Sequence, residues 1–415
     1  MSRILFDARW IMPVSSPPIE NGRLVIENGR IVSIDRAAGR DRSAIDLGDA
    51  IVLPGLVNAH THLELTACRG RVPYRGSFVD WIEQLTIINP HNGPDDLLEK
   101  SIGEGFKQSI TAGVTTLADI GAGPYVLRQW SRAPINTVGF LEVLGVGPML
   151  CNDHLRSFGK VTELFQSIAD VDSGENLKRV GISPHAPYST DISIYREAVH
   201  FVGQTGRHIC THLAETREEL QFLSDGTGPL RDLLERFGLW DGSFEPPGCS
   251  PVEYVRQLGL LEHDPLLVHV NYVDDKDLGL LAEHQCSIAF CPRSQRYFEH
   301  EPHRYREMLA RGINVCIGTD SLASNDSLSV LDELRFLRSQ DQKISNRQLL
   351  EMGTIAGAGA LKSDGQIGTL ESGKKADLAV VPLNNPATTD PVDDLLTGES
   401  VSSSVYVSGK RIYPN

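Results

Sequence analysis

Histidine and carboxylate residues lie at the ends of several short apolar runs in this sequence. His60 and His62 end the run GLVNAHTH, and side chains two residues apart point the same way on an extended strand. Later runs end in further residues of these types, namely His185, His212, His269 and Asp320. Imidazole nitrogens with one carboxylate suit zinc, or else iron. The set predicts a hydrolysis by metal-activated water.

Four of these residues form the predicted ligand set for one divalent metal ion, with zinc first and iron as the other candidate: His60, His62, His212 and Asp320. Glu215 comes three residues after His212 and is the candidate to move protons during the reaction. His269 is predicted to hold the attacking hydroxide or to polarise the developing charge. We therefore take Glu215 and His269 as the catalytic pair.

Each residue also has a purely structural reading. His185 fits a hydrogen-bonded loop histidine, and His269 fits a satisfied core histidine. Asp320 precedes Ser321 and fits a helix cap, while Glu215 fits a first-turn acid beside the helix dipole. Unrelated structural roles do not explain why these residues all lie at the same end of their apolar runs. The joint pattern favours a site.

The apolar runs alternate with helical stretches such as Asp95–Ala112, Ile192–Thr205 and Ser327–Ser339. Repeated β-α units predict an α/β fold with a parallel sheet and right-handed crossovers. Eight units favour a closed (β/α)8, TIM-like barrel, with an open doubly wound sheet as the alternative. The runs are 55–62, Gly113–Ile120, Asn136–Gly145, Val180–Pro187, His208–Glu215, Leu266–Tyr272, Ser287–Ser294 and Asn314–Ser321.

Both ends of the chain read as short strands joined by turns. ENGR at Glu27–Arg30 and Ser-Gly-Lys near the C-terminus are hairpin signals. We expect residues 1–53 and 362–415 to form a small β-sandwich domain and residues 54–361 to form the catalytic barrel. Two connections are long, 63–95 and 216–265, and long connections often form binding loops.

Composition excludes several classes of partner. The 415 residues carry a formal charge of −15, which disfavours nucleic acid and anionic membranes. No run approaches the roughly 20 apolar residues of a membrane span, and the N-terminus has no signal-peptide pattern. The seven cysteines are scattered without a CxxC motif, so neither disulfides nor a cysteine-based zinc site is expected. A cytoplasmic location fits this pattern.

The segments PGLVNAHTH, HLAET, GTDS and GTLESGKKADLAVV resemble the amidohydrolase superfamily over nearly the whole chain. This resemblance implies a distorted TIM barrel with a metal centre. The fourth run ends SPHAPYS, without the lysine of binuclear members, which implies the mononuclear deaminase and chlorohydrolase branch. In that branch the roles of ligands and catalytic pair fall on the residues assigned above, and His185 contacts the substrate.

Within this branch, two departures argue against methylthioadenosine/S-adenosylhomocysteine deaminases. Trp81 is present in the loop after the first strand. Those deaminases have a ribose-binding glutamate shortly after this tryptophan, but the matching position here falls near Pro90–Asn92, which has no carboxylate. Glu142 stands where an arginine is expected. The segments HTHLELT, GSFVDWI, SPHAPYS and CPRSQRYF resemble the aminodeoxyfutalosine deaminases of the alternative menaquinone pathway more closely.

The resemblance implies hydrolytic deamination of an adenine-type ring in a small heterocyclic substrate, and a homodimer is compatible with the family. Predicted substrate contacts besides His185 are Phe78, Trp81, Glu142, Arg293 and Tyr297. An aromatic ring can stack on a purine, and an arginine can meet a carboxylate. The alternatives are a chlorohydrolase, a deaminase of another heterocycle (guanine, a triazine, or methylthioadenosine and S-adenosylhomocysteine), and a non-catalytic barrel scaffold.

Overall fold

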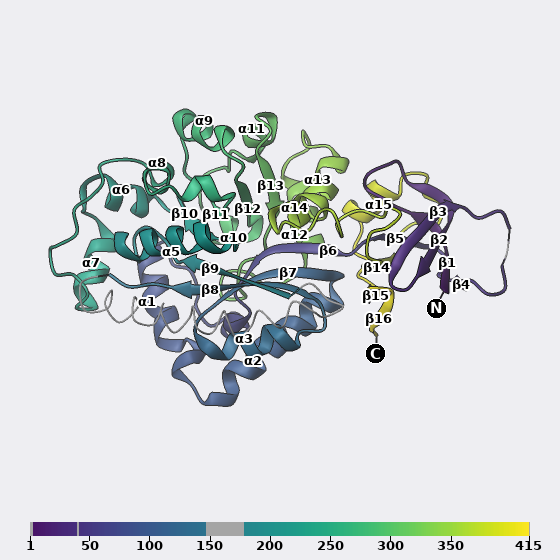
Figure 1. Cartoon of the computed structure of the whole chain (residues 1–415), viewed down its shortest axis with the longest axis horizontal. Coiled ribbons are helices and arrows are strands. Elements are labelled where there is room, and N and C mark those ends of the chain that lie inside the picture. Colours follow the sequence, from purple (N-terminus) through teal and green to yellow (C-terminus); the bar gives the residue numbers. More distant parts are fainter. Residues whose placement is uncertain (1–2, 40, 147–177, 415) are drawn as a thin grey trace.

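Two parallel four-stranded sheets form the centre of the molecule. The computed structural model describes residues 3–39, 41–146 and 178–414. The sheets have the orders β6-β7-β8-β9 and β10-β11-β12-β13, and Figure 1 shows helices on their outer side. The strands are β6 (Leu56–Thr61), β7 (Val114–Gly121), β8 (Asn136–Val143), β9 (Lys178–Pro184), β10 (Cys210–Leu213), β11 (Leu266–His269), β12 (Ser287–Phe290) and β13 (Asn314–Ile317). All eight runs predicted as strands are confirmed.

The two sheets meet at both of their edges. A parallel bridge between Ile182 and Ile209 connects β9 to the residue before β10. On the other side, the backbone N–H groups of Thr319 and Asp320 each donate to the His60 carbonyl at 3.1 Å. This arrangement of eight parallel strands is that of an α/β, TIM-barrel-like fold.

Helices follow most strands, as β-α units require. The predicted helix Ile192–Thr205 is α5, which begins after its cap Asp191 and ends at the left-handed Gly206. The others include α2 (Asp95–Thr111), α3 (Gly123–Arg132), α9 (Asp275–Glu283), α10 (Pro292–Tyr297), α11 (Tyr305–Ala310), α12 (Val330–Gln340), α13 (Asn346–Met352) and α14 (Ile355–Ala360). No helix in the described part of the chain is long and apolar enough to cross a membrane.

The two long connections contain helices of their own. The connection after β6 holds two short 3-10 helices, η1 (Leu63–Cys68) and η2 (Pro90–Asn92), with α1 (Phe78–Ile88) between them. The connection after β10 holds α6 (Arg217–Asp225), α7 (Pro229–Arg236), α8 (Pro251–Gln257) and the 3-10 helix η4 (Leu260–His263). The Arg236 guanidinium on α7 donates to the Glu83 carboxylate on α1 at 3.1 Å. The two connections therefore meet.

Both ends of the chain contribute to one eight-stranded sheet, which Figure 1 shows beside the central sheets with both termini. Its order is β16-β15-β14-β5-β1-β2-β3, with β4 paired to β1. The predicted hairpins at 27–30 and 408–410 are confirmed. The strands are β1 (Arg3–Ile11), β2 (Ile19–Glu27), β3 (Arg30–Arg36), β4 (Ile45–Asp46), β5 (Ala50–Pro54), β14 (Leu378–Pro382), β15 (Ser404–Val407) and β16 (Lys410–Tyr413), with α15 (Pro391–Thr397) between β14 and β15.

Candidate active site

Three of the predicted histidine ligands converge at the ends of β6 and β10. The Nε2 atoms of His62 and His212 lie 3.2 Å apart. The ring of His60 lies 4.8 Å from that of His62 and 5.1 Å from that of His212, between centroids. His60 is 1% exposed and His212 is 4% exposed. His60 in β6 and His62 just after it are two positions apart, so their side chains leave the strand end on the same side and meet at one point.

Asp320 follows β13 and completes the group. Its Oδ1 atom lies 3.6 Å from His60 Nε2. Its Oδ2 atom accepts hydrogen bonds from the Ser294 and Ser324 hydroxyls at 2.7 and 2.6 Å. One carboxylate oxygen is therefore held by the protein while the other faces the histidines.

These residues fit a divalent metal ion. Tetrahedral bonds of about 2.0–2.1 Å place neighbouring ligand atoms roughly 3.4 Å apart, and the His62–His212 and His60–Asp320 separations of 3.2 and 3.6 Å are close to that value. Both ring nitrogens of His60 are buried without a hydrogen-bond partner among the described residues. A buried imidazole in that state is explained by a ligand that accepts its lone pair.

The protonation states also suit a cation. Burial lowers the pKa of His62 to about 3, with His60 adding to the effect. Burial likewise holds the pKa of His212 well below its ordinary value. Burial alone raises the pKa of Asp320, but the interactions with His60 and His269 hold it well below its ordinary value. Neutral imidazoles beside an ionised carboxylate are the forms that bind metal.

Glu215 and His269 lie together next to this group. Glu215 Oε1 is 3.5 Å from His269 Nε2, and both residues are buried. Burial raises the pKa of Glu215 well above its ordinary value, and the Asp320 and Glu219 carboxylates raise it further. The His303 Nε2 group lies 2.8 Å from the His269 carbonyl. Glu215 precedes α6, whose cap is Thr216, so it is not a first-turn acid of that helix.

The turn that carries Glu215 is fixed by a buried carboxylate that the sequence did not single out. Glu219 accepts the backbone N–H of Ala214 at 3.0 Å and that of Glu215 at 2.8 Å. Ala214, His269 and Asp320 have positive φ angles of 50°, 68° and 58°. Such angles are uncommon for residues other than glycine and cost about 1 kcal/mol or more each. The fold therefore maintains strained backbone where three of its strands end.

A cavity of about 390 Å³ opens above these residues. Polar groups from the strand ends form its floor, including His62, His212, Glu215, His269 and Asp320. Its upper wall is apolar and comes from both long connections. The apolar lining includes Phe78, Trp81, Ile82 and Leu85 of α1, Leu230, Leu233 and Leu234 of α7, and Phe237, Leu239 and Phe298.

His185 and Glu142 line the cavity beside the histidine group, as predicted. The His185 Nδ1 atom lies 2.6 Å from the Ser189 hydroxyl, and its Nε2 atom lies 3.9 Å from Glu142 Oε1. Burial lowers the pKa of His185 to about 4. Burial raises the pKa of Glu142 to about 8, with a contribution from Glu64. Burial thus favours the neutral form of both groups, and in that form they make hydrogen bonds without a net charge.

Two of the predicted substrate contacts lie elsewhere. The Arg293 guanidinium pairs with Asp326, and its backbone N–H donates to Glu333 at 2.9 Å. The Tyr297 hydroxyl donates to the Val72 carbonyl and accepts the Tyr74 N–H at 3.0 Å. Neither residue is among those that line the cavity. Phe78 and Trp81 do line it, and they also pack on Phe298, with centroids 5.2 and 4.8 Å from its ring.

Several residues that line the cavity are not among the predicted substrate contacts, although the sequence contains a pattern that indicates some of them. Leu230, Leu233 and Leu234 have the i, i+3, i+4 spacing of an apolar helix face. Glu64 is two residues after His62, and its carboxylate lies 3.0 Å from the His91 ring. Phe298 follows the segment CPRSQRY directly. No pattern within the sequence joins these positions, because they meet only through tertiary contacts.

A model of the "Amidohydrolase family" matches residues 51–412. The 5-methylthioadenosine/S-adenosylhomocysteine deaminase of Moorella thermoacetica is 30% identical over 95% of this chain and 89% of its own length. The aminofutalosine deaminase of Helicobacter pylori, solved with methylthio-coformycin, has a TM-score of 0.80 at 21% identity and covers 99% of this chain and 100% of its own. The zinc-bound atrazine chlorohydrolase of Arthrobacter aurescens has a TM-score of 0.81 at 20% identity and covers 99% and 95%.

The family model and the relative from Moorella each span most of the chain. The chain belongs to the amidohydrolase family and is a hydrolase of carbon–nitrogen bonds.

Proposed function

We propose that this protein is a metal-dependent deaminase of an adenine-type ring in a nucleoside. The observation that carries the proposal is the convergence of the His60, His62, His212 and Asp320 ligand group with Glu215 on the floor of one cavity. The scaffold alternative predicts a broken ligand set, whereas every predicted member of the set is present, with His60, His212 and Asp320 buried and His62 half-buried.

The residues have separate tasks in this reaction. The three histidines and Asp320 would hold the metal ion, which, when bound, lowers the pKa of water toward neutrality. Glu215 takes a proton from the attacking water and delivers it to the ring nitrogen next to the amino-bearing carbon. His269, held 3.5 Å from Glu215, orients the water and stabilises the charge that develops. Glu215 then takes the second proton, from the hydroxyl that the attack leaves on the ring carbon, and gives it to the amino group, so that ammonia leaves as the ring carbonyl forms.

The metal we propose is zinc, with iron as the alternative. Three imidazole nitrogens and one carboxylate oxygen at tetrahedral spacing support zinc. The zinc in the atrazine chlorohydrolase structure agrees with this choice.

For the substrate we propose an adenine nucleoside with an altered 5′ group. The names of the relatives support this class, since they include 5-methylthioadenosine/S-adenosylhomocysteine and 5′-deoxyadenosine deaminases. The motifs quoted above support aminodeoxyfutalosine, and therefore a role in menaquinone synthesis. The apolar side of the cavity, from Phe78 to Leu234, gives either kind of 5′ group a place to pack.

We also make proposals about the architecture of the chain and its location. We propose that the eight parallel strands close into a barrel over residues 54–361, and that residues 1–53 and 362–415 form the small β-sandwich domain. The edge contacts at Ile182 and Thr319 support closure. We also propose that the protein is a homodimer and that it is located in the cytoplasm. The six cysteines in the described part of the chain, which does not include Cys151, are all free thiols, and this supports a reducing compartment.

The test is a panel of substrates with zinc-loaded protein. Ammonia release would be measured for aminodeoxyfutalosine, 5′-methylthioadenosine, S-adenosylhomocysteine, 5′-deoxyadenosine, adenosine and guanine. Chloride release from atrazine is measured in parallel. We expect ammonia from at least one adenine nucleoside and no chloride. Chloride without ammonia would replace the proposal by the chlorohydrolase alternative.

A further inference from the structure

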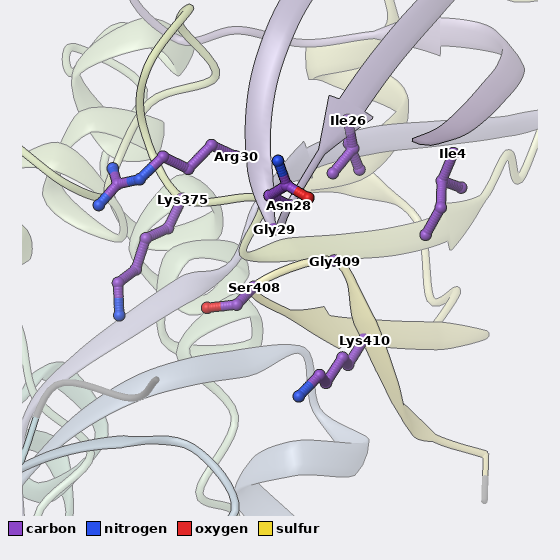
Figure 2. A pocket seen from close by; sticks show the side chains of 9 residues that line it. All are labelled: Ile4, Ile26, Asn28, Gly29, Arg30, Lys375, Ser408, Gly409 and Lys410. Atoms are coloured by element: carbon purple, nitrogen blue, oxygen red, sulfur yellow. The ribbon is translucent and has the colours of Figure 1, made fainter. Parts of the chain in front are cut away.

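The hollow between two hairpin turns of the terminal sheet is lined by cationic residues whose side chains have partners within the chain (Figure 2). The Arg30 guanidinium donates to the Gly373 carbonyl at 2.7 Å, and the Asp377 carboxylate lies within electrostatic reach of Lys375. A segment that is held under strain lies instead at the active site.

The peptide that joins His269 to Val270, at the end of β11, has an uncommon conformation. Both residues have positive φ angles, of 68° and 55°. Such an angle is an outlier for a β-branched residue such as valine, and each one costs about 1–3 kcal/mol. A strained peptide persists only where its surroundings fix it. The position of the His269 side chain therefore depends on the groups that hold this peptide.

Both ends of the strained peptide are held by hydrogen bonds to other elements. The Val270 N–H donates to the carbonyl of Leu213, the last residue of β10, at 2.9 Å. The His269 carbonyl lies 2.8 Å from Nε2 of His303, in the loop between α10 and α11. A carbonyl only accepts hydrogen bonds, so Nε2 carries the proton. The His303 imidazole thus holds the carbonyl end of the peptide.

The ring of His303 is itself fixed in place. It stacks on Phe290, the last residue of β12, with centroids 4.0 Å apart and an interplanar angle of 18°. Its Nδ1 atom is buried without a hydrogen-bond partner among the described residues. Burial lowers the pKa of His303 to about 4, although hydrogen bonds to the backbone of His269 and Val270 oppose this effect. A neutral imidazole has one N–H group, and the geometry directs it to the His269 carbonyl.

Two neighbouring residues hold the loop of His303 against the segment that follows β11. The His300 Nδ1 atom lies 3.2 Å from the Tyr272 hydroxyl. The Arg304 guanidinium donates to the Val273 carbonyl at 3.2 Å. The loop therefore contacts the end of β11 and the residues after it at three points, of which His303 is the one that reaches the strained peptide.

We propose that His303 is a positioning residue for His269 in the deamination. Its hydrogen bond keeps the peptide after His269 in the left-handed conformation, which sets the direction of the His269 side chain. His269 Nε2 lies 3.5 Å from Glu215 Oε1, and a misplacement of about 1 Å can lower a rate about a hundredfold. His303 is not among the residues that line the cavity, so it acts through His269. This role rests on the proposed function, because it requires the proposed task of His269.

Two substitutions at one position separate the hydrogen bond from the ring stacking. His303→Gln keeps an N–H donor at a similar reach from the backbone but loses the ring. His303→Phe keeps a ring that can stack on Phe290 but loses the donor. Each zinc-loaded variant is compared with the wild-type protein in kcat and KM for ammonia release, in zinc content, in unfolding temperature and in crystal structure.

We expect His303→Phe to lower kcat about ten- to a hundredfold, with KM and zinc content changed less than about twofold. His303→Gln should keep more than about a third of the wild-type kcat, because the donor to the His269 carbonyl remains. In the crystals, the distance between His269 Nε2 and Glu215 Oε1 should increase by about 1 Å in His303→Phe and stay as in the wild type in His303→Gln.

A wild-type kcat and an unmoved His269 in His303→Phe would overturn the proposal. So would an active His303→Phe beside an inactive His303→Gln, because the stacking would then be the part that matters. Zinc loss in parallel with kcat also overturns it, as a general defect. A displaced His269 in His303→Gln does the same, and this comparison remains if His303→Phe does not fold. Wild-type protein without deaminase activity would refute the proposed function, while the crystal structures still decide whether His303 positions His269.

Discussion

At the scale of single residues, the proposed chemistry depends on Glu215, a carboxyl group whose burial favours its protonated form. Glu215 has a pKa well above its ordinary value because it is buried beside Asp320 and Glu219. Its position after His212 places it 3.5 Å from His269 and next to the ligand group. Proton transfer by one positioned group contributes roughly 10²–10⁴-fold to a rate.

Replacing Glu215 by glutamine should therefore abolish most of the activity without loss of the metal. We expect kcat to fall at least a thousandfold, because the amide cannot take a proton, while the metal content stays near one ion per chain. Stopped assays of ammonia and elemental analysis measure the two quantities. The control is Glu218→Gln, a partly exposed neighbour on α6. A fall of less than tenfold in Glu215→Gln would remove Glu215 from the proton-transfer role.

The metal itself is tested by His62→Ala. Its Nε2 atom lies 3.2 Å from that of His212, so its loss removes one corner of the ligand group. We expect bound zinc to fall below about a tenth of an ion per chain, because the removal of one of four ligands greatly lowers the affinity of the site for the metal. His200→Ala, an exposed histidine on α5, should keep its metal. Full zinc content in His62→Ala would contradict the assignment.

The part of the candidate site that could be predicted from the sequence is the part whose residues lie at the ends of strands. His60, His62, His212 and Asp320 each end or follow an apolar run, and parallel strands bring such residues together. The motif CPRSQRYF predicts Arg293 and Tyr297 as substrate contacts, but neither residue lines the cavity. Their partners, Asp326 and Val72, come from segments far along the chain, and no sequence pattern fixes such pairings.

At the scale of elements, the site depends on turns held by buried carboxylates. Glu219 accepts the N–H groups of Ala214 and Glu215. Asp119, at the end of β7, accepts the Leu63 N–H at 2.8 Å and the Thr61 hydroxyl at 3.0 Å. Each carboxylate fixes the turn that follows one group of functional residues. The hydrophobic periodicity that predicts helices and strands does not predict these turns.

Glu219→Gln should separate positioning from metal binding. The amide side chain keeps one acceptor but turns a donor toward a backbone N–H, so the Glu215 turn loses one of its two hydrogen bonds. We expect kcat to fall ten- to a hundredfold while KM and zinc content change less than twofold. Steady-state kinetics and elemental analysis report these values. Loss of zinc in parallel with kcat would indicate a general folding defect instead.

The apolar wall from α1 and α7 should act mainly on substrate binding. Leu234 lines the cavity and is 7% exposed. Leu234→Ala removes apolar contact that the ground state and the transition state share, so KM for a 5′-substituted substrate should rise about tenfold with kcat nearly unchanged. Leu280→Ala, on α9 and outside the cavity, is the control. An unchanged KM would remove α7 from the substrate-binding surface.

At the scale of the whole molecule, a buried aspartate connects the terminal sheet to the central strands. Asp377 accepts the Ser408 N–H at 2.7 Å and the Asn136 side-chain amide at 2.6 Å, the latter at the start of β8. Burial raises the pKa of Asp377 above its ordinary value. The alternation and hairpin signals predicted both sheets, but this connection joins residues 241 positions apart and has no local signature.

Asp377→Ala should destabilise the protein as a whole. It removes the acceptor of the buried Asn136 side-chain N–H and of the part-buried Ser408 N–H, and each such loss costs about 1–3 kcal/mol. We expect the free energy of unfolding in urea to fall by about 2–4 kcal/mol. The exposed Asp364→Ala is the control, with a change below about 0.5 kcal/mol. A similar small change in Asp377→Ala would show that the two parts of the chain are coupled by other contacts.

The central claim is that one metal centre in this chain deaminates an adenine nucleoside. The most direct measurement is ammonia release from aminodeoxyfutalosine and 5′-methylthioadenosine by protein with one zinc ion per chain, compared with protein stripped by a chelator and then reloaded. The account predicts rapid release from at least one nucleoside, loss on stripping and recovery with zinc. Zinc-loaded protein that releases no ammonia from any adenine nucleoside would contradict it.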